Sequence, residues 1–433
     1  MTETAGRTVR VLVTHRGERF GVVGPFPVES ARWPEVEEVT VRLERAYGVP
    51  VMVLRLLSVE GGEPPRGGLV TYHAEALSRP DRPAATGAGA PTGATPTDAD
   101  APTDAPTDAP TGTPTGAPTA EDPLRADWAT PDGLRSALDW AGRTLADRGR
   151  PATGPVAQVK SWNLSGLFRI PTAAGPAWLK TTPRFAVDEA SVIAAFGAVD
   201  PGLVPVVLGS DGRRILLEHV PGEDCWGVPQ DAMLAVVGRW AAAQAALAGG
   251  PAIPGLPDRS PHALVGRFRE LLTTGPTTGA TTGLTNPERA AADRLADELP
   301  LLVERLDACG LPVTVLHGDF HPGNWRSDGR RTVAVDFSDA HLGHPALDGL
   351  RPRDFLGSAR WADVRDAWVR AWSGLVPGSD PRRALVLAEP LMHVSYAVRY
   401  QEFLDGIEAG ERIYHEGDPA SEIRAALASS TRL

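Results

Sequence analysis

Alternating apolar and polar positions at the start of the chain predict a small unit of four strands and one helix. We expect these strands at Val9–Thr14, Arg19–Val23, Val49–Leu57 and Gly68–Ala76. Arg16 and Gly17 lie between the first two strands, where a hairpin needs its turn. The stretch Pro34–Tyr47 carries apolar side chains at helical spacing among acidic ones and stops before Gly48, so we expect an amphipathic helix there. This β-β-α-β-β order assigns residues 1–77 to a small α/β accessory domain.

A second pattern predicts a β-rich lobe followed by a helical one. An amphipathic helix is expected over Pro131–Asp147, and a second helix, Val187–Phe196, interrupts the strands that follow. We expect those strands at Val156–Lys160, Leu167–Pro171, Ala177–Lys180, Val204–Leu208 and Arg214–His219. From Asp231 onward the periodicity is mostly helical, with one hairpin between Val313 and Val335. The chain is therefore predicted to be α+β. Its two lobes are expected at 125–222 and 223–433.

Two stretches are poor in large apolar residues and interrupt these units. Residues 78–124 consist largely of Pro, Thr, Ala, Gly and Asp, so they cannot bury enough apolar surface to offset the entropy of ordering. We therefore expect a flexible, disordered linker between the accessory domain and the rest of the chain. Thr273–Pro287 has a similar composition and is expected to be a loop between two helices.

Charge and cysteine content narrow the functional classes. The 433 residues carry a formal net charge of −11, which argues against broad binding to nucleic acid or anionic membranes. No apolar run approaches the length that spans a bilayer, and Met1–Arg10 lacks the apolar region of a secretory signal. Cys225 and Cys309 are too few for a disulfide framework. We therefore expect a cytoplasmic protein without nucleic-acid or membrane partners.

The strongest chemical signal is the segment 315–324, VLHGDFHPGN, which is followed shortly by VAVDFS. The residues between are expected to form two short strands joined by the tight turn Asp328-Gly329. This hairpin would bring Asn324 and Asp336 to the same open end. An amide oxygen and a carboxylate suit a hard cation such as Mg²⁺, which needs few protein ligands besides phosphate and water. Asp319, on the loop before the hairpin, can orient a hydroxyl group and accept its proton.

This HGDxxxxN and DFS pattern resembles the catalytic and metal-binding segments of the aminoglycoside phosphotransferase family, which is related to choline kinases and eukaryotic-like protein kinases. The resemblance implies a bilobal protein kinase-like fold. It also implies an ATP- and Mg²⁺-dependent enzyme that transfers the γ-phosphate to a hydroxyl group of a small molecule. Asp319 would be the catalytic base, and Asn324 and Asp336 would hold Mg²⁺ on ATP. His317 and Asp348 would brace the catalytic loop.

Two other interpretations fit the residues of this segment. It could be a polar turn in a helical protein with no catalytic role. The histidines could instead bind zinc, but they lie on loops rather than at i and i+4 of a helix, and no cysteine is close in sequence. The histidines concerned are His317, His321, His341 and His344.

Lysine is scarce in this chain, which draws attention to the two that are present. Of 43 basic residues, only Lys160 and Lys180 are lysines. Lys180 ends an expected strand at the place where the resemblance requires a lysine that contacts the α- and β-phosphates of ATP. Glu189, in the next helix, is expected to hold Lys180 in position, with Asp188 as a neighbouring alternative. Lys160 is expected to be an ordinary exposed lysine.

Further contacts with ATP are assigned from the same resemblance. Asn163 and Ser165, in the turn between the first two strands of the small lobe, are expected to contact phosphate; a hairpin turn capped by Asn163 is the alternative. Glu218 and Val220 are expected to form the hinge that reads adenine. The turn has a single glycine, Gly166, where kinases have several. That feature favours the alternative of a nucleotide-binding regulatory protein, a pseudokinase.

The sequence does not identify the acceptor beyond a small molecule with a hydroxyl group. The acidic net charge is compatible with a cationic acceptor. Candidates for the lining of its pocket are Glu389, His393, Tyr396, Tyr400 and Glu402. The element order of residues 1–77 also resembles the Nudix scaffold, but the helix lacks the glutamate-rich catalytic box. We therefore expect this domain to be an accessory or interface domain.

Overall fold

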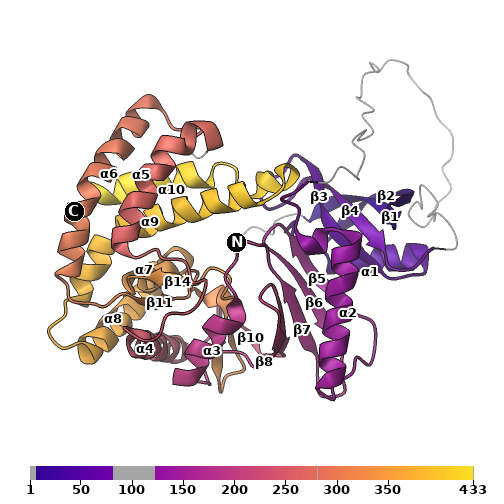
Figure 1. Cartoon of the computed structure of the whole chain (residues 1–433), viewed down its shortest axis with the longest axis horizontal. Coiled ribbons are helices and arrows are strands. Elements are labelled where there is room, and N and C mark those ends of the chain that lie inside the picture. The colour runs from indigo at the N-terminus through magenta and orange to yellow at the C-terminus, as the bar shows by residue number, and fades with distance from the viewer. Residues whose placement is uncertain (1–5, 81–121, 280, 433) are drawn as a thin grey trace, which may run out of the picture.

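The computed structural model of the chain describes residues 6–80, 122–279 and 281–432. These residues form a small N-terminal domain, a β-rich small lobe and a helical large lobe (Figure 1). The N-terminal domain packs against the small lobe, and the large lobe lies on the other side of it. The predicted α+β architecture of two lobes and an additional domain is confirmed. Most of the linker expected at 78–124 lies outside the described residues.

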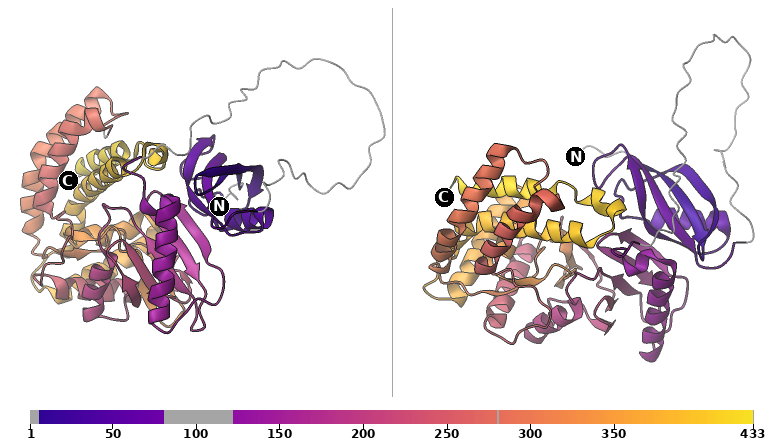
Figure 2. Two further views of the ribbon diagram at one scale, coloured as in Figure 1. Left: turned by 45° about the vertical axis from the view of Figure 1, so that its right-hand side comes forward. Right: turned by 45° about the horizontal axis from the view of Figure 1, so that its top comes forward.

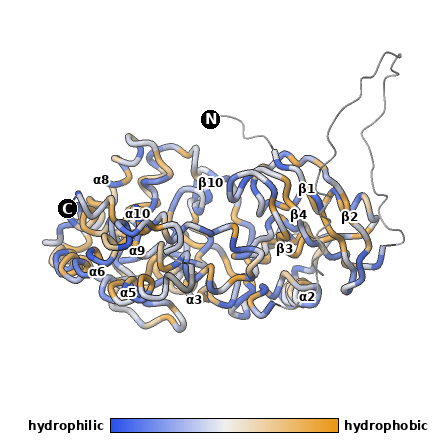
Figure 3. The backbone as a smooth tube through the Cα atoms, turned by 90° about the horizontal axis from the view of Figure 1, so that it is seen from above, coloured by the Kyte–Doolittle hydropathy of each residue, from blue (hydrophilic) through white to orange (hydrophobic). Residues whose placement is uncertain are grey.

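The N-terminal domain is a four-stranded sheet covered by one helix. Its elements are β1 (Arg7–His15), β2 (Glu18–Val28), α1 (Glu37–Tyr47), β3 (Val51–Glu60) and β4 (Leu69–Ala76). The strand order is β2-β1-β4-β3, with β1 and β4 parallel and the other neighbours antiparallel. Val9, Val11 and Val13 are fully buried because alternate residues of β1 face the core. Helix α1 ends where Gly48 adopts a left-handed conformation with φ of 70°. Figure 3 shows hydrophobic stretches along this sheet interleaved with hydrophilic ones.

The small lobe is an antiparallel sheet with two helices, one before its first strand and one between its third and fourth strands. Its elements are η1 (Asp127–Ala129), α2 (Pro131–Asp147), β5 (Ala157–Trp162), β6 (Ser165–Ile170), β7 (Ala177–Thr181), α3 (Glu189–Val199), β8 (Val207–Ser210) and β9 (Arg214–Glu218). The strand order is β5-β6-β7-β9-β8, so β5 and β8 are the edges. Thr130 caps α2 by accepting a hydrogen bond from Gly133 N, and Pro131 occupies the first turn.

The large lobe is helical, with short strands beneath the helices. Its helices are α4 (Gln230–Leu247), α5 (Pro261–Thr278), α6 (Asn286–Asp307), α7 (Ala346–Leu350), α8 (Ser358–Leu375), α9 (Pro381–Gly406) and α10 (Asp418–Ser430), with 3₁₀ turns η2 (Pro322–Asn324), η3 (Arg351–Phe355) and η4 (Ala409–Tyr414). Its strands are β10 (Glu223–Asp224), β11 (Thr314–Leu316), β12 (Trp325–Ser327), β13 (Thr332–Ala334) and β14 (His341–Gly343). Among the described residues, no helix is both long and apolar enough to cross a lipid bilayer.

Two expectations about the large lobe need correction. Helix α5 runs to Thr278, so the loop expected from Thr273 is shorter at its start. The hydroxyls of Thr273 and Thr274 donate to the carbonyls four residues earlier, which lets threonine continue a helix. The expected hairpin, β12 with β13, is present, but β11 also pairs with β14. Pairing over such short strands depends on partners distant in sequence, so periodicity does not reveal it.

The N-terminal domain joins the small lobe along the edge strand β5. β3 is an edge strand of its own sheet, and both backbone groups of Val53 bond to the side chain of Gln158 on β5. Val53 N lies 2.7 Å from Gln158 Oε1, and Gln158 Nε2 lies 2.7 Å from Val53 O. Val36 N donates to Val159 O at 3.1 Å, so α1 begins against the same edge. Figure 2 shows the two sheets side by side in both views. The domain therefore covers an edge that would otherwise be free for pairing.

A buried cluster of charges joins the N-terminal domain to the end of the large lobe. Arg55 of β3 and Arg125 bind the same carboxylate, that of Glu408, at 2.8 and 3.0 Å. Glu411 of η4 accepts a hydrogen bond from Leu56 N at 2.8 Å. The side chains of Arg55, Arg125 and Glu408 are mostly buried, so removing Glu408 would take this carboxylate away from two buried arginines. The domain is thus attached to both lobes.

Replacing Glu411 by glutamine should stabilise the protein at neutral pH. Burial raises the pKa of Glu411 to about 8, although Leu56 N and Arg55 act in the other direction and Glu408 adds to the increase. The folded chain therefore keeps a proton that the unfolded chain releases, and stability falls between the unfolded pKa and pH 8, by at most about 1.4 kcal/mol per pH unit. Glutamine does not titrate. We expect the melting temperature of Glu411→Gln to match the wild type near pH 4 and exceed it increasingly up to pH 8. If the melting temperatures of the variant and the wild type differed by the same amount at every pH, the raised pKa of Glu411 would be contradicted.

Candidate active site

The loop after β11 is held in place by one buried carboxylate. Asp348 accepts hydrogen bonds from His317 N at 2.8 Å and Gly318 N at 3.0 Å, and also from Trp240 and Gln244 of α4. His317 adds a contact of 3.0 Å between Nε2 and Val335 O. Gly318 has φ of 85°, and a Cβ there would lie 2.1 Å from Asp339 O, so the glycine before Asp319 is required sterically. The bracing roles predicted for His317 and Asp348 are confirmed.

Asp319 is held as an anion at the end of this loop. Its Oδ1 accepts from Arg351 Nε at 2.7 Å, and its Oδ2 accepts from Asn324 Nδ2 at 3.0 Å. His321 Nε2 lies 3.2 Å from Oδ2. Burial by itself would raise the pKa of Asp319, but Arg351 and His321 outweigh it and hold the pKa well below its usual range. Asp319 is therefore a carboxylate throughout the physiological pH range.

Asn324 and Asp336 lie at the same end of the β12–β13 hairpin, as the sequence predicts. Val335 N donates to Asn324 O at 2.8 Å, which ties the two ends together. Asp336 adopts a left-handed conformation with φ of 68°, uncommon outside glycine, and its side chain is 48% exposed. The hydrogen bonds of the Asn324 side chain to Asp319 use its amide nitrogen, which leaves the amide oxygen for a cation. One carboxylate and one amide oxygen fit Mg²⁺, which completes its shell with phosphate and water.

Lys180 connects the two lobes through a pair of carboxylates. Its Nζ lies 2.6 Å from Glu189 Oε1 on α3 and 2.6 Å from Asp336 Oδ1. Burial would lower the pKa of Lys180, but Asp336 and Glu189 outweigh it and raise the pKa above its usual value. Burial likewise acts to raise the pKa of Asp336, and Lys180 overcomes it and lowers this pKa to about 2. Asp188, the alternative to Glu189, instead caps α3 by accepting from Ala190 N.

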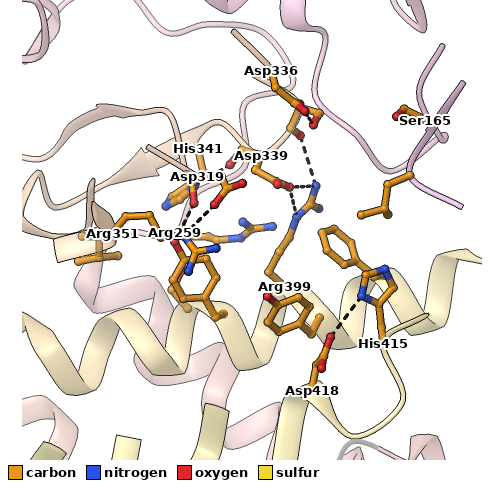
Figure 4. A pocket seen from close by; sticks show the side chains of 18 of the residues that line it. Ser165, Arg259, Asp319, Asp336, Asp339, His341, Arg351, Arg399, His415 and Asp418 are labelled. Atoms are coloured by element: carbon orange, nitrogen blue, oxygen red, sulfur yellow. Dashed lines mark hydrogen bonds and ion pairs between the residues drawn. The ribbon is translucent and has the colours of Figure 1, made fainter. Parts of the chain in front are cut away.

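A cavity of about 280 Å³ lies between the lobes (Figure 4). Lys180, Asp319 and Asp336 lie on its wall together with Ser165. Its floor comes from α9, and the N-terminal domain contributes a single residue, Pro65. Also on the wall are Arg259, Asp339, His341, Arg351, Tyr396, Arg399, Tyr400, Phe403, Tyr414, His415 and Asp418. A buried lysine and an ionised aspartate thus face a common space, which is the arrangement that phosphoryl transfer needs.

The model of the phosphotransferase enzyme family matches residues 157–385, more than half of the chain. The chain belongs to this phosphotransferase family. The match begins at β5 and ends within α9, so the N-terminal domain, η4 and α10 lie outside it. No curated protein matches the chain in sequence.

The chain is similar to solved structures of small-molecule kinases. Choline kinase LicA from Streptococcus pneumoniae matches with a TM-score of 0.50 and 11% identity, over 68% of this chain and 99% of that one. Choline kinase from Cryptosporidium parvum Iowa II gives 0.49 and 10%, over 64% and 89%. Macrolide 2′-phosphotransferase MphH from Brachybacterium faecium gives 0.43 and 19%, over 65% and 98%. The predicted protein kinase-like fold and the resemblance to this family are confirmed.

The other residues expected to contact ATP do not all line the same cavity. Ser165 lines the cavity and accepts from Trp162 Nε1 at 3.0 Å. The side chain of Asn163 is buried and donates to Glu411 O at 3.2 Å, so its amide faces η4. Glu218 and Val220 line a smaller cavity of about 150 Å³ at the opposite end of the sheet, where Glu218 also pairs with Arg150 at 2.8 Å. The four residues therefore lie in three places: Ser165 in the larger cavity, Glu218 and Val220 in the smaller one, and Asn163 against η4.

The candidates for the acceptor pocket divide in the same way. Tyr396 and Tyr400 line the cavity, and Tyr396 donates to Gly318 O at 3.0 Å. The other three candidates form ion pairs instead: Glu389 with Arg353, His393 with Glu422, and Glu402 with Arg259 and Arg267. On the described wall of the cavity, the histidines, cysteines and carboxylates do not gather in a group of three that could hold a metal ion.

The arginines of the cavity are absent from the predictions made on sequence. Arg351 pairs with Asp319, Arg399 with Asp339 at 2.6 Å, and Arg259 with Glu402 at 2.5 Å (Figure 4). In a chain that uses arginine for nearly every basic residue, no local signal distinguishes these three from surface arginines. Their roles follow only from the carboxylates beside them.

Proposed function

We propose that the protein is an ATP- and Mg²⁺-dependent phosphotransferase that transfers the γ-phosphate of ATP to a hydroxyl group of a small molecule. The observation that carries the proposal is that Asp319 and the Lys180–Asp336 pair lie on one cavity. Membership of the phosphotransferase family supports the same reaction class. Because ATP is a cytoplasmic nucleotide, the proposal includes a cytoplasmic location.

In this mechanism Lys180 binds phosphate oxygens of ATP, and Glu189 keeps its ammonium group in place. Asn324 and Asp336 hold Mg²⁺, which supplies charge neutralisation at the phosphate oxygens when it is bound. Backbone groups near Ser165 cover the phosphates. The cavity beside Glu218 and Val220 receives adenine.

Asp319 acts on the acceptor. Its carboxylate orients the hydroxyl group and takes its proton, while the hydroxyl oxygen forms the new bond to the γ-phosphorus and the bond to the β–γ bridging oxygen breaks. Arg351 holds the carboxylate from the other side at 2.7 Å, so the base is positioned before the acceptor arrives. Catalysis would rest on positioning and on electrostatic stabilisation of the transferring phosphoryl group.

A screen of hydroxyl compounds would test this proposal. The purified protein, MgATP and a panel of amino alcohols, aminoglycosides, macrolides, sugars and hydroxy amino acids would be assayed for ADP release, with ³¹P NMR to detect a new phosphate ester. We expect one chemical class to stimulate ADP release and to yield the ester in equal amount. ADP release at the acceptor-free rate with every compound, in a protein that binds MgADP by calorimetry, would contradict the proposal and favour the pseudokinase alternative.

A further inference from the structure

The N-terminal domain meets the wall of the cavity at two residues, Pro65 of its own and Tyr414 of the large lobe. Pro65, in the loop between β3 and β4, lines the cavity directly. Tyr414, at the end of η4, lines the same cavity and is packed into the hydrophobic core of the N-terminal domain. Both features lie outside the segment that matches the phosphotransferase family. A domain that only solubilised or tethered the enzyme would not need to share a core residue with the active-site wall.

Trp33 holds both of these residues. Its backbone N–H donates to Pro65 O at 2.9 Å, and its indole N–H donates to Gly67 O at 2.8 Å, so the β3–β4 loop is fixed from two directions. The Trp33 ring meets the Tyr414 ring edge-on, with centroids 5.5 Å apart. Tyr72 donates to Trp33 O at 2.7 Å, which anchors the tryptophan to the central strand β4. Trp33 itself is fully buried and does not line the cavity.

The segment 408–418 is attached to the N-terminal domain through Glu408, Glu411 and Tyr414. Glu408 binds Arg55 at 2.8 Å and Glu411 accepts from Leu56 N at 2.8 Å, both on β3. Beyond Tyr414, His415 lies within 3.3 Å of Asp418 at the start of α10. This segment of eleven residues is therefore fixed between the N-terminal domain at one end and the helices of the large lobe at the other.

The same segment forms the aromatic wall of the cavity. His415 stacks on Tyr400 of α9 with centroids 5.9 Å apart, and Tyr414 meets Trp162 at 5.8 Å. Figure 4 shows His415 and Asp418 at one end of the cavity, with Asp319 and Arg351 at the other. The adenine candidates Glu218 and Val220 lie beyond the far strands of the sheet, whereas the N-terminal domain covers the edge strand β5. The wall therefore belongs to the cavity that Asp319 lines and is separate from the smaller cavity beside Glu218 and Val220.

We propose that the N-terminal domain is an integral part of the acceptor site, and that Trp33 is the positioning residue that fixes Pro65 and Tyr414 against the acceptor. This inference rests on the proposed phosphotransferase function. It predicts that contacts between the domain and segment 408–418 determine the KM of the acceptor and leave the affinity for MgATP nearly unchanged. It also gives residues 1–77 a role in selecting which small molecules are phosphorylated.

Substitutions in the full-length protein would test the inference. Trp33→Leu removes the ring that meets Tyr414, and we expect the KM of the best acceptor from the ADP-release panel to rise about five- to tenfold. Trp33→Phe keeps an aromatic contact and should restore most of the affinity. In both variants the KM of ATP and the affinity for MgADP by calorimetry should stay within about twofold of the wild type. Phe26→Leu, a core substitution of the same domain at a residue that stacks with Arg42, is the control and should change neither KM.

A second pair of variants covers the case in which Trp33→Leu does not fold. Glu411→Ala removes the anchor of η4 on Leu56 N, and Glu411→Gln keeps an oxygen that accepts this hydrogen bond. Hydrogen–deuterium exchange at residues 408–418 should increase in Glu411→Ala and in Trp33→Leu, with unchanged exchange in the loop 317–324. This readout needs no acceptor, so it tests the attachment of segment 408–418 to the N-terminal domain separately from the proposed function. Unchanged exchange in 408–418, or an equal rise in the KM of ATP and acceptor, would overturn the inference.

Discussion

Replacing Asp319 by asparagine should lower kcat by about 10²- to 10⁴-fold and leave the affinity for MgADP unchanged. Asparagine has the same shape, but it cannot accept the proton of the acceptor hydroxyl, and it no longer attracts Arg351. The loop itself should persist, because Asp348 and His317 hold it independently of Asp319. Steady-state kinetics with the best acceptor and calorimetry with MgADP would measure the two quantities.

The Asp319→Asn variant also removes the carboxylate that lies 2.7 Å from Arg351, so a control for the lost charge is needed. Asp354 lies 3.9 Å from Arg351 and is 42% exposed, outside the wall of the cavity. Asp354→Asn removes a carboxylate from the same arginine and should retain nearly full kcat. If Asp319→Asn turned over acceptor and ATP at the wild-type rate, Asp319 would not be the base.

Replacing Lys180 by methionine should weaken MgATP binding and lower kcat/KM by about 10²- to 10³-fold. The change removes the cation that pairs with both Glu189 and Asp336, so the protein should also lose stability, by about 3–5 kcal/mol if Glu189 stayed charged. The double variant Lys180→Met, Glu189→Gln should recover much of the melting temperature and none of the activity. That separation identifies a functional role, because a purely structural lysine would regain activity together with stability.

The chain offers a matched control for this variant. Lys160 is the other lysine, lies two strands away on the edge strand β5, and pairs through its backbone with Glu35. Lys160→Met removes the same charge with the same side-chain shape and should leave kcat/KM within about twofold. A similar loss in both lysine variants would mean that net charge, rather than the position of Lys180, determines the activity.

The catalytic segment could be read from sequence because its geometry is local. Asn324 and Asp336 flank one hairpin, and a tight Asp-Gly turn fixes how their ends meet. Asp319 lies five residues before Asn324, and the chain cannot place them far apart. The strands and helices followed for the same reason, since alternation and helical periodicity depend on neighbours within a few residues. Helix α2, at Pro131–Asp147, has the bounds that its capping residues indicate.

The position of Asn163 shows where local reasoning stops. Its place in the β5–β6 turn indicated a phosphate contact or a turn cap, yet its amide is buried against η4, almost 250 residues further along the chain. Neither sequence pattern nor turn chemistry contains information about that partner. The paired arginines of the cavity are a second example, because each is selected by a carboxylate distant in sequence.

The sequence by itself determined the elements and the order of the domains, because these depend on periodicity and composition. The residues that would carry phosphoryl transfer followed from their spacing together with the resemblance to a known family. Only the tertiary structure decided what the N-terminal domain touches and which side chains line the cavity around Asp319. Those contacts join β3, β5, α9 and η4, whose mutual positions depend on packing across the whole chain. A buried contact between distant segments leaves no periodic trace in either of them, so only the folded chain reveals it.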